Sequence, residues 1–197
     1  GMTIGEYGQM INGEKWLKGK VKCELTVITC HNYDHQTFWS LNVSPSPNLR
    51  SDFSMSLYPS LCLLVATTLT VGRGTDGPFE RYGHPDFPDT LKFSFVPKPN
   101  FGSKHPKHEG KTCYGVNLTD LKYHRMDGMD LSFLIDANKL LDGKLFVNKE
   151  NFFNKLAGNN ILVKQIQEGK SEAEIKASWK VELDAFEVVR SKYLLYR

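Results

Sequence analysis

Residues 72–90 limit the possible folds most, because glycine and proline occur there too often for a long helix or a buried strand. The stretch contains four glycines and three prolines, at Gly72, Gly74, Gly77, Gly83, Pro78, Pro85 and Pro88. It also carries charged and aromatic side chains, which suit an ordered loop better than a disordered one. Loops of this length inside a compact domain are more often functional or disordered than plain connections. We therefore expect either a binding or catalytic loop or a structural Ω-loop.

The segment from Gly72 to Gly77 matches the dinucleotide-binding pattern G-x-G-x-x-G. That motif works where a helix starts at the loop, because the helix N-terminus holds the pyrophosphate. Here Pro78 follows at once, and Gly83 and Pro85 arrive before two helical turns can form. The sequence gives little support for a nicotinamide or flavin site, and we expect no cofactor.

Charge and hydropathy exclude further classes of protein. The chain has 197 residues with 25 basic and 22 acidic side chains, and its net charge of +3 is too weak to predict nucleic-acid binding. Its longest apolar run, Leu61–Ala66, has six residues, whereas a membrane span needs about 20. No signal peptide is visible in this segment, and Gly1-Met2 is an unusual natural start, so we expect an excised fragment or a tag remnant.

The cysteines and histidines form no recognisable metal or redox motif. None of the four cysteines stands in C-x-x-C spacing, and we expect all four to be small buried residues. Cys23 and Cys30, seven positions apart in a strand-like run, should face opposite sides and not pair. His105 and His108 lack a third ligand nearby, so we expect no metal site.

Hydrophobic patterns predict one domain of the α+β (mixed α/β) class over residues 1–197. Alternating β-branched and aromatic residues in the first two-thirds predict a small sheet, with strands at Cys23–Cys30, Leu91–Phe95 and Lys111–Leu118. No internal repeat or flexible linker interrupts the chain. Helices packed on the sheet complete the expected fold.

Helices are predicted at both ends of the chain and in its middle. Two capping boxes begin helices, at Thr3–Glu6 and at Ser171–Glu174. Another helix should run from Asp52 to about Val65, kinked or divided by Pro59. The final third is expected to be helical, and its last helix carries one apolar stripe, at Ile175, Trp179, Leu183, Phe186, Val189 and Tyr193.

Charged residues of the glycine-rich loop and of the next connection are the candidate site. Arg73 and Glu80 form either a functional pair, which grips a ligand carboxylate and a hydroxyl, or an ion pair that holds the loop shut. Between Lys98 and Lys111, lysines and histidines crowd a connection that only Glu109 opposes. This connection is either an anion-binding patch or, in the interpretation we favour, a solvated hairpin tip.

Five ordered segments carry a family resemblance. They are Gly1-Met2-Thr3-Ile4-Gly5-Glu6; Pro45-Ser46-Pro47-Asn48-Leu49; Leu57-Tyr58-Pro59 with Cys62; Gly72-Arg73-Gly74-Thr75 with Pro78-Phe79-Glu80 and Gly83; and Gly158-Asn159 with Gln165-Ile166, Gly169, Ser178-Trp179 and Lys192-Tyr193-Leu194-Leu195-Tyr196. Their order and spacing resemble the C-terminal part of exo-β-N-acetylmuramidases of the NamZ type, long catalogued as a domain of unknown function. The resemblance covers essentially the whole chain.

The resemblance implies a glycoside hydrolase of bacterial cell-wall recycling, which releases N-acetylmuramic acid from the non-reducing ends of peptidoglycan fragments. Its members have a Rossmann-like N-terminal domain, which carries the expected catalytic glutamate, and a smaller C-terminal domain across the cleft. We therefore expect this chain to be the C-terminal domain of a protein whose N-terminal domain is absent here, and to be inactive alone. Its expected partners are a sugar containing N-acetylmuramic acid and that N-terminal domain. By family analogy its location is periplasmic or extracellular.

The resemblance also assigns site residues. Arg73 could hold the lactyl carboxylate of muramic acid, while Asn48, Thr75 and Glu80 could contact sugar hydroxyls or the acetamido group. His84, from the same loop as Arg73, is a fifth candidate for substrate binding. Glycoside hydrolysis normally needs two carboxyl groups, and Glu80 is the weak catalytic candidate in this chain.

One position departs from the family pattern. Where the family commonly has Phe-Glu-Gly-Thr, this chain has Leu64-Val65-Ala66-Thr67, so Val65 replaces an acidic residue. Either that acid is not essential or the activity of this member has changed. The alternative function is therefore a non-catalytic module that binds a glycan or a protein.

Overall fold

The computed structural model describes residues 1–119, 128–146 and 149–196, and the chain separates into two compact units. Unit 1 comprises Gly1–Ser40 with Lys176–Arg197, and unit 2 comprises Leu41–Ile175. A division into two compact units does not show whether they fold separately or together. The single domain predicted over residues 1–197 therefore stays a prediction.

Unit 2 contains a three-stranded antiparallel sheet in the order β1-β3-β2. Its strands are β1 (Arg81–His84), β2 (Phe93–Phe95) and β3 (Cys113–Asn117). Strands β2 and β3 were predicted, but β1 was not, because it lies inside the glycine- and proline-rich stretch. Gly83 of β1 lies opposite Gly115 of β3, and a Cβ on either glycine would collide with the backbone of the neighbouring strand. At least one glycine of that stretch, Gly83, is therefore needed for the close pairing of β1 with β3.

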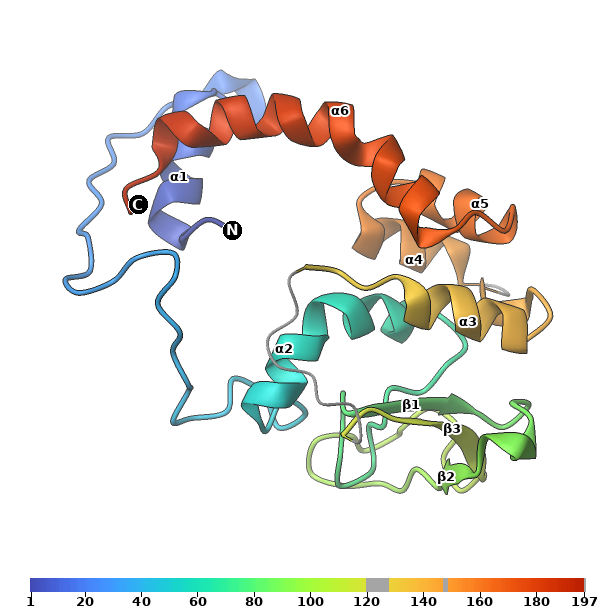
Figure 1. The fold of residues 1–197 in the computed structure, drawn as a ribbon. Coiled ribbons are helices and arrows are strands. Elements are labelled where there is room, and N and C mark those ends of the chain that lie inside the picture. Colours follow the sequence, from blue (N-terminus) through green and yellow to red (C-terminus); the bar gives the residue numbers. More distant parts are fainter. Residues whose placement is uncertain (120–127, 147–148, 197) are drawn as a thin grey trace. The chain divides into compact units, whose positions relative to one another are not determined.

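Helices α2 and α3 lie on one side of this sheet (Figure 1). The helices of unit 2 are α2 (Asp52–Leu61), α3 (Ser132–Leu140), α4 (Glu150–Ala157) and α5 (Ile161–Gln167), with short 3-10 turns η2 (Cys62–Ala66), η3 (Asp89–Leu91) and η4 (Lys144–Phe146). Ser51 caps α2, which continues through Pro59 and changes to 3-10 geometry only after Leu61. Pro59 therefore neither ends α2 nor divides it into two helices.

The hydrophobic core of the chain lies in unit 2. Its fully enclosed side chains include Leu57, Leu61, Leu64, Leu69, Phe79, Leu118, Leu131, Leu134, Leu145, Phe146 and Phe153. The rings of Tyr82 and Phe133, 5.8 Å apart, join the sheet to α3. The fold is mixed α+β, with a small sheet before a helical C-terminal third, as predicted from the sequence.

Unit 1 contains α1 (Ile4–Gly13), the 3-10 turns η1 (Lys18–Lys20) and η5 (Ser191–Tyr193), and the part of α6 (Glu172–Arg190) that follows Ile175. The Thr3–Glu6 capping box is present, and the second box, at Ser171 and Glu174, forms at the start of α6. Both helix starts were therefore predicted correctly.

The strand predicted at Cys23–Cys30 is absent from this chain, where these residues have no regular structure. A strand needs a neighbour for its backbone hydrogen bonds, and no described strand lies beside this segment. The expectation of buried cysteines is wrong for Cys23 and Cys30, which are exposed, whereas Cys62 is half-buried and Cys113 buried. All four thiols are free.

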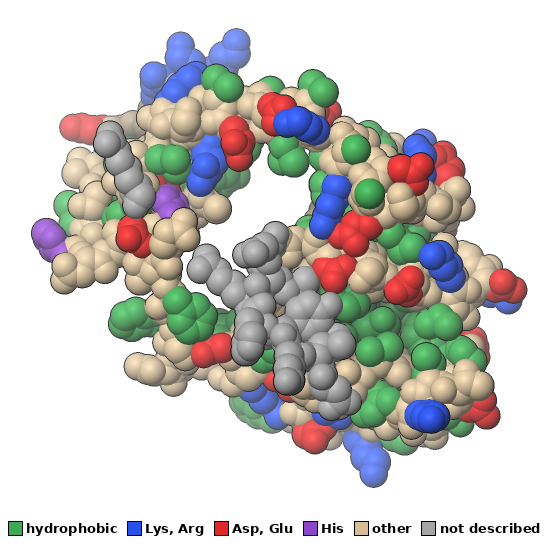
Figure 2. Space-filling model, viewed as in Figure 1, with side chains coloured by type: hydrophobic (Ala, Val, Ile, Leu, Met, Phe, Trp, Pro, Cys, Tyr) green, Lys and Arg blue, Asp and Glu red, His purple; other side chains and the backbone are tan. Residues whose placement is uncertain are grey.

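The apolar stripe of α6 is only partly covered, although the sequence predicted that it would pack. Only Ile175 on this helix is buried, whereas Leu183 and Phe186 are 52% and 39% exposed. Figure 2 shows hydrophobic side chains on the surface over α6. Among the described residues, no helix combines the length and apolar character that crossing a bilayer requires.

Candidate functional site

The glycine-rich turn after η2 packs tightly against the basic connection of residues 98–111. Gly72 and Gly74 have φ angles of +75° and +82°, which residues with side chains rarely adopt. A Cβ on Gly74 would lie 2.7 Å from the carbonyl oxygen of Lys98. The Gly74 carbonyl accepts a 2.9 Å hydrogen bond from the Lys98 N–H. These two glycines make the close approach possible and fix the backbone of Arg73 between them.

Arg73 lines a cavity of about 190 Å³, called the Arg73 cavity below. The other lining residues are Val65, Leu69, Thr70, Val71, Ser103, His105 and Lys107. The Arg73 Nε atom is buried and has no hydrogen-bond partner among the residues that the structure describes, and the guanidinium carbon lies 5.5 Å from the centre of the Phe79 ring. A buried donor without a partner costs free energy. The Arg73 cavity therefore favours a ligand that brings an acceptor, above all a negatively charged one.

Lys107 supplies a second positive charge to the Arg73 cavity. Its Nζ donates hydrogen bonds of 3.2, 2.6 and 2.7 Å to the carbonyl oxygens of Val65, Thr67 and Leu69. Burial, and after it the charges of Lys149 and Arg73, lowers the pKa of Lys107 from 10.5 to about 8. At neutral pH the ammonium form still prevails, and it has three N–H groups for three acceptors.

Among the described residues that line the Arg73 cavity, none carries a carboxylate that would balance these two cations. Val65, where the resemblance led us to expect an acidic residue, forms part of the wall. An arginine guanidinium recognises a carboxylate through charge-assisted hydrogen bonds, and the Lys107 ammonium, whose three N–H groups are taken by carbonyls, adds its positive charge. The cavity can therefore bind an anion, but the described part of its wall offers no carboxyl group for acid–base chemistry.

Glu80 does not line the Arg73 cavity. Its carboxylate accepts a hydrogen bond from the hydroxyl of Ser51, the residue that caps α2. In the described chain, no hydrogen bond or ion pair joins Glu80 to Arg73. The loop is closed by a different ion pair, in which Arg81 donates to Asp76 at 2.8 Å. Of the two alternatives predicted for Arg73 and Glu80, the ion pair that would hold the loop shut is therefore not found among the described residues.

Thr75 and Asn48 both make structural hydrogen bonds. The Thr75 hydroxyl donates to the Gly72 carbonyl at 2.7 Å and accepts the Gly77 N–H at 3.2 Å. The Asn48 amide nitrogen donates to the Gly102 carbonyl at 2.7 Å, and its buried Oδ1 has no partner in the described part of the chain. Neither side chain lines the Arg73 cavity.

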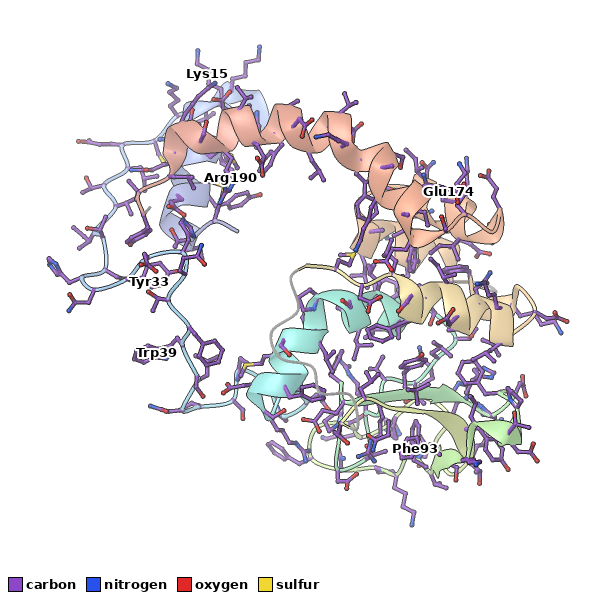
Figure 3. The ribbon with its side chains drawn as sticks, in the orientation of Figure 1. Lys15, Tyr33, Trp39, Phe93, Glu174 and Arg190 are labelled. Atoms are coloured by element: carbon purple, nitrogen blue, oxygen red, sulfur yellow. The ribbon has the colours of Figure 1, made fainter. Side chains whose placement is uncertain are left out.

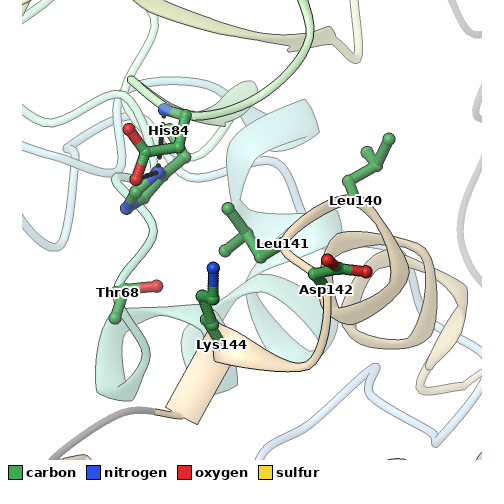
Figure 4. A pocket seen from close by; sticks show the side chains of 7 residues that line it. Thr68, His84, Leu140, Leu141, Asp142 and Lys144 are labelled. Carbon is green, nitrogen blue, oxygen red and sulfur yellow. Dashed lines mark hydrogen bonds and ion pairs between the residues drawn. The ribbon is translucent and has the colours of Figure 1, made fainter.

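His84 lines a second cavity, of about 550 Å³ (Figure 4). Its Nδ1 accepts the Asp86 N–H at 3.0 Å, and its ring meets that of His108 edge to face at 4.6 Å. The Nε2 of His108 lies 2.7 Å from the Thr68 carbonyl oxygen. Burial is the main cause that lowers the pKa of both histidines, and each also lies near Lys107 and Lys111. At neutral pH both imidazoles are therefore neutral.

The structure thus separates the five predicted site residues. Arg73 and His84 line two different cavities, and the other three are held by partners elsewhere. Sequence reasoning missed Lys107, although the crowding of basic residues between 98 and 111 was a signal. The favoured interpretation of that connection as a solvated tip is wrong for Lys107 and His108, whose side chains are partly buried against residues 65–69. No three His, Cys, Asp or Glu side chains within the described ranges converge as metal ligands.

Comparison with known proteins gives matches to both the C-terminal and the N-terminal model of one family, so part of the N-terminal region, which was expected from the sequence to be absent, is present in this chain. Residues 56–196 match the family model described as "Exo-beta-N-acetylmuramidase NamZ, C-terminal", and residues 1–52 match "Exo-beta-N-acetylmuramidase NamZ, N-terminal". The peptidoglycan β-N-acetylmuramidase NamZ of Bacillus subtilis is 30% identical over 212 residues, which cover 100% of this chain and 50% of that protein.

Two crystal structures of DUF1343 family proteins from Bacteroides fragilis are similar along the whole chain. One superposes with a TM-score of 0.89 at 42% identity, and the other with a TM-score of 0.77 at 18% identity. Each alignment covers 100% of this chain and 56% of the solved chain. The second similarity concerns the fold alone. The present chain spans about half the length of the relatives it matches.

Proposed function

The chain belongs to the NamZ exo-β-N-acetylmuramidase family, a family of glycoside hydrolases, and on that premise we propose that it is the C-terminal, substrate-facing part of such an enzyme. The enzyme would release N-acetylmuramic acid from the non-reducing ends of peptidoglycan fragments. The protein that its gene encodes in full is called the parent below. Peptidoglycan lies outside the cytoplasmic membrane, so we also propose a periplasmic or extracellular location for the parent.

The Arg73 cavity is the observation that supports this proposal. N-acetylmuramic acid differs from N-acetylglucosamine by a lactyl ether that ends in a carboxylate. The Arg73 guanidinium, whose Nε has no partner in the described chain, and the half-buried Lys107 offer two positive charges, with no acid among the described residues that line the cavity. A lactyl carboxylate would supply the acceptor that the Arg73 Nε lacks. The cavity would thus distinguish the muramic sugar from the neutral one.

The size and lining of the Arg73 cavity support a site that is completed elsewhere. Its volume of about 190 Å³ is below the roughly 300–1,000 Å³ of complete small-molecule sites. Hydrolysis of a glycoside normally uses two carboxyl groups, and this cavity provides none from its described walls. We therefore propose that the chain holds the acidic side of the sugar and is inactive without the rest of the parent.

Hydrolysis of chromogenic glycosides tests this function. The parent should cleave a muramic acid glycoside, while the 197-residue chain should not. Arg73→Ala in the parent should raise KM for that glycoside at least about tenfold, and Lys104→Ala, a charge removed from an exposed site, should not. Failure of the parent to hydrolyse the glycoside at any pH between about 5 and 9 would contradict the proposal, because a general acid or base works best near its operating pH.

Val65 favours a second candidate function, in which the chain belongs to a non-catalytic module that binds a glycan or a protein. With no acid at this position, the Arg73 cavity keeps its affinity for anions whether or not the parent still cleaves a bond. Titration with muropeptides separates the two functions. Binding that depends on Arg73, in a parent without hydrolytic activity, would support the second one.

A further inference from the structure

Phe79 has a backbone conformation that costs free energy at a bulky residue. Its φ angle is +60°, in the left-handed region that glycine adopts freely and that large side chains avoid. The other described residues that have a side chain and a positive φ are Lys, Asn, Asp and His, and none of them is buried as Phe79 is. Strain of this kind persists where the surrounding structure holds it, and it is concentrated at binding and catalytic sites.

The surroundings of Phe79 hold it against the turn that carries Arg73. The Phe79 N–H donates a 2.8 Å hydrogen bond to the Val71 carbonyl, and only 1% of the residue is exposed. The centre of its ring lies 5.2 Å from that of the Tyr58 ring, on α2, and 5.5 Å from the guanidinium carbon of Arg73. A cation this close to an aromatic face is attracted by the ring quadrupole, more strongly where water is excluded. Phe79 therefore supports the Arg73 side chain as well as filling the core.

Arg81 shows how a second arginine of this chain is held. Its guanidinium carbon lies 5.6 Å from the centre of the Phe93 ring, on β2 (Figure 3). Its Nη1 also donates to Asp76 at 2.8 Å, so this guanidinium is already bound to a carboxylate. Arg73 has the aromatic contact but, in the described chain, no such carboxylate. The difference between the two arginines is therefore the acid and not the ring.

An aromatic face and a carboxylate hold an arginine in different ways. A carboxylate binds the N–H groups at the edge of the guanidinium plane, and an incoming anion would have to displace it. An aromatic ring attracts the cation through its face and leaves that edge unoccupied. The Phe79 ring can therefore keep Arg73 in place while the N–H groups of the guanidinium stay available to a ligand.

From these observations we propose that Phe79 is the positioning residue of the Arg73 cavity and thereby determines its selectivity for a sugar that carries a carboxylate. The strained backbone of Phe79 brings the ring to the guanidinium, and the ring, in place of an acid, holds Arg73 ready to bind the lactyl carboxylate. This role rests on the proposed function for the identity of the ligand, whereas the contact between Phe79 and Arg73 does not.

Fluorinated phenylalanines at position 79 test the ring face while they keep nearly the same shape. Mono-, di- and trifluorophenylalanine weaken the negative potential of the face step by step. In the parent, the dissociation constant for N-acetylmuramic acid, measured by calorimetry, should rise with each fluorine and reach about fivefold with three, because the cation–π attraction weakens. The affinity for N-acetylglucosamine, which has no carboxylate, should not follow this series.

Phe79→Leu gives a second measurement, because it removes the aromatic face and keeps an apolar side chain. In the parent it should raise KM for the chromogenic muramic acid glycoside about fivefold and change kcat less than about twofold, since the contact positions a binding group. Phe93→Leu is the matched control. It removes the ring beside Arg81, which Asp76 still holds, and it should leave KM within about twofold of the wild-type value.

The Nε–H resonance of Arg73 reports its position without any substrate. In the parent, isotopically labelled at its arginines, the ring current of Phe79 should shift this resonance. Phe79→Leu should abolish the shift and speed the exchange of this proton with water at least about tenfold, because the side chain is no longer held. Phe93→Leu should leave the Arg73 resonance unchanged.

Two results would overturn the role of Phe79. The first is an Arg73 resonance that is the same in Phe79→Leu and in the wild type. The second is an affinity for N-acetylmuramic acid that stays constant along the fluorinated series, because Phe79 would then act only through its shape. If Phe79→Leu does not fold, the fluorinated proteins supply both measurements. A parent that binds no muramic sugar removes the proposed function and the selectivity, and the Arg73 resonance still decides whether Phe79 holds Arg73.

Discussion

Lys107 donates a 2.6 Å hydrogen bond to the carbonyl oxygen of Thr67, and with it joins the basic connection to the segment that forms the wall of the Arg73 cavity. The adjacent His108 contacts the carbonyl of Thr68, so two consecutive side chains bind two consecutive carbonyls. Carbonyls of extended neighbours point to opposite sides. The connection therefore holds residues 67–68 by both of their carbonyls, and Lys107 has a structural role as well as an electrostatic one.

Lys107→Met should destabilise unit 2 because it leaves three carbonyl oxygens without their donor. We expect a loss of about 2–3 kcal/mol in the free energy of unfolding, typical of buried groups that lose a charged partner. Denaturant titration of the variant and the wild type measures it. Lys104→Met is the control on the same connection, and because that side chain is exposed it should change stability by less than about 0.5 kcal/mol.

Anion binding and stability should respond to alkaline pH in opposite directions. As pH rises through about 8, Lys107 in the folded chain loses its charge, so the affinity for N-acetylmuramic acid should fall. In the unfolded chain Lys107 keeps its proton up to about pH 10.5. Between about pH 8 and 10.5 the folded state therefore binds fewer protons than the unfolded state, and the contribution of Lys107 to the free energy of unfolding rises with pH. Calorimetric titration and thermal melts at about pH 7 and about pH 9.5, on either side of the folded pKa, measure the two effects. In Lys107→Met both pH dependences should be weaker, and an unchanged profile would assign them to other groups.

Glu6 should make unit 1 sensitive to acid. Burial alone would raise the pKa of its carboxyl, but the N–H groups of Thr3, Leu195 and Tyr196 and the His35 side chain outweigh burial and lower the pKa to about 2. Because the unfolded value is 4.5, this stabilisation is complete above pH 4.5 and is lost as pH falls towards 2.

Glu6→Gln should therefore lower the free energy of unfolding at pH 7 by about 1–3 kcal/mol and flatten its dependence on pH between 4.5 and 2. The N–H groups of Leu195 and Tyr196 donate hydrogen bonds to the Glu6 carboxylate, so hydrogen–deuterium exchange of these two amides measures the loss directly. Glu24→Gln, at an exposed position of the same unit, is the matched control and should change neither quantity.

Val65→Glu should place a carboxylate in the wall of the Arg73 cavity. That group would pair with Arg73 and Lys107, so affinity for N-acetylmuramic acid should fall about tenfold or more. Val65→Gln, with the same shape but no charge, should have a smaller effect. Equal losses in both variants would show that size rather than charge matters at this position.

Local sequence signals predicted the parts of the fold that depend on near neighbours. The capping boxes at Thr3–Glu6 and Ser171–Glu174 formed because their partners lie three residues apart. The run at residues 23–30 has the composition of a strand, yet it forms none, because strand pairing depends on a neighbour distant in sequence. Strand β1 was missed for the converse reason, since β3 pairs with a glycine-containing segment that lacks local strand preference.

The site was harder to predict because it depends on which way side chains point. Spacing placed Arg73 and Glu80 in one loop, but the Ser51 hydroxyl holds Glu80 at the start of α2, away from the Arg73 cavity. Lys107 enters that cavity through contacts with backbone carbonyls, which no side-chain pattern encodes. A basic residue beside a tight turn can therefore either lie in solvent or point into a cavity. The packing of the turn determines which of the two occurs.

Glu80→Gln separates a structural role of this residue from a catalytic one. Its carboxylate binds the α2 cap Ser51, so we expect Glu80→Gln to reduce stability by about 1 kcal/mol while the kcat value for the parent changes less than about threefold. Ser51→Ala removes the same hydrogen bond from the other side together with the cap of α2, so it should produce a larger loss of stability. Thermal melts and initial rates on the muramic acid glycoside provide the two readouts. If kcat falls about 100-fold or more in Glu80→Gln without a comparable fall in Ser51→Ala, Glu80 acts on the substrate, because losing a general acid or base costs about that much.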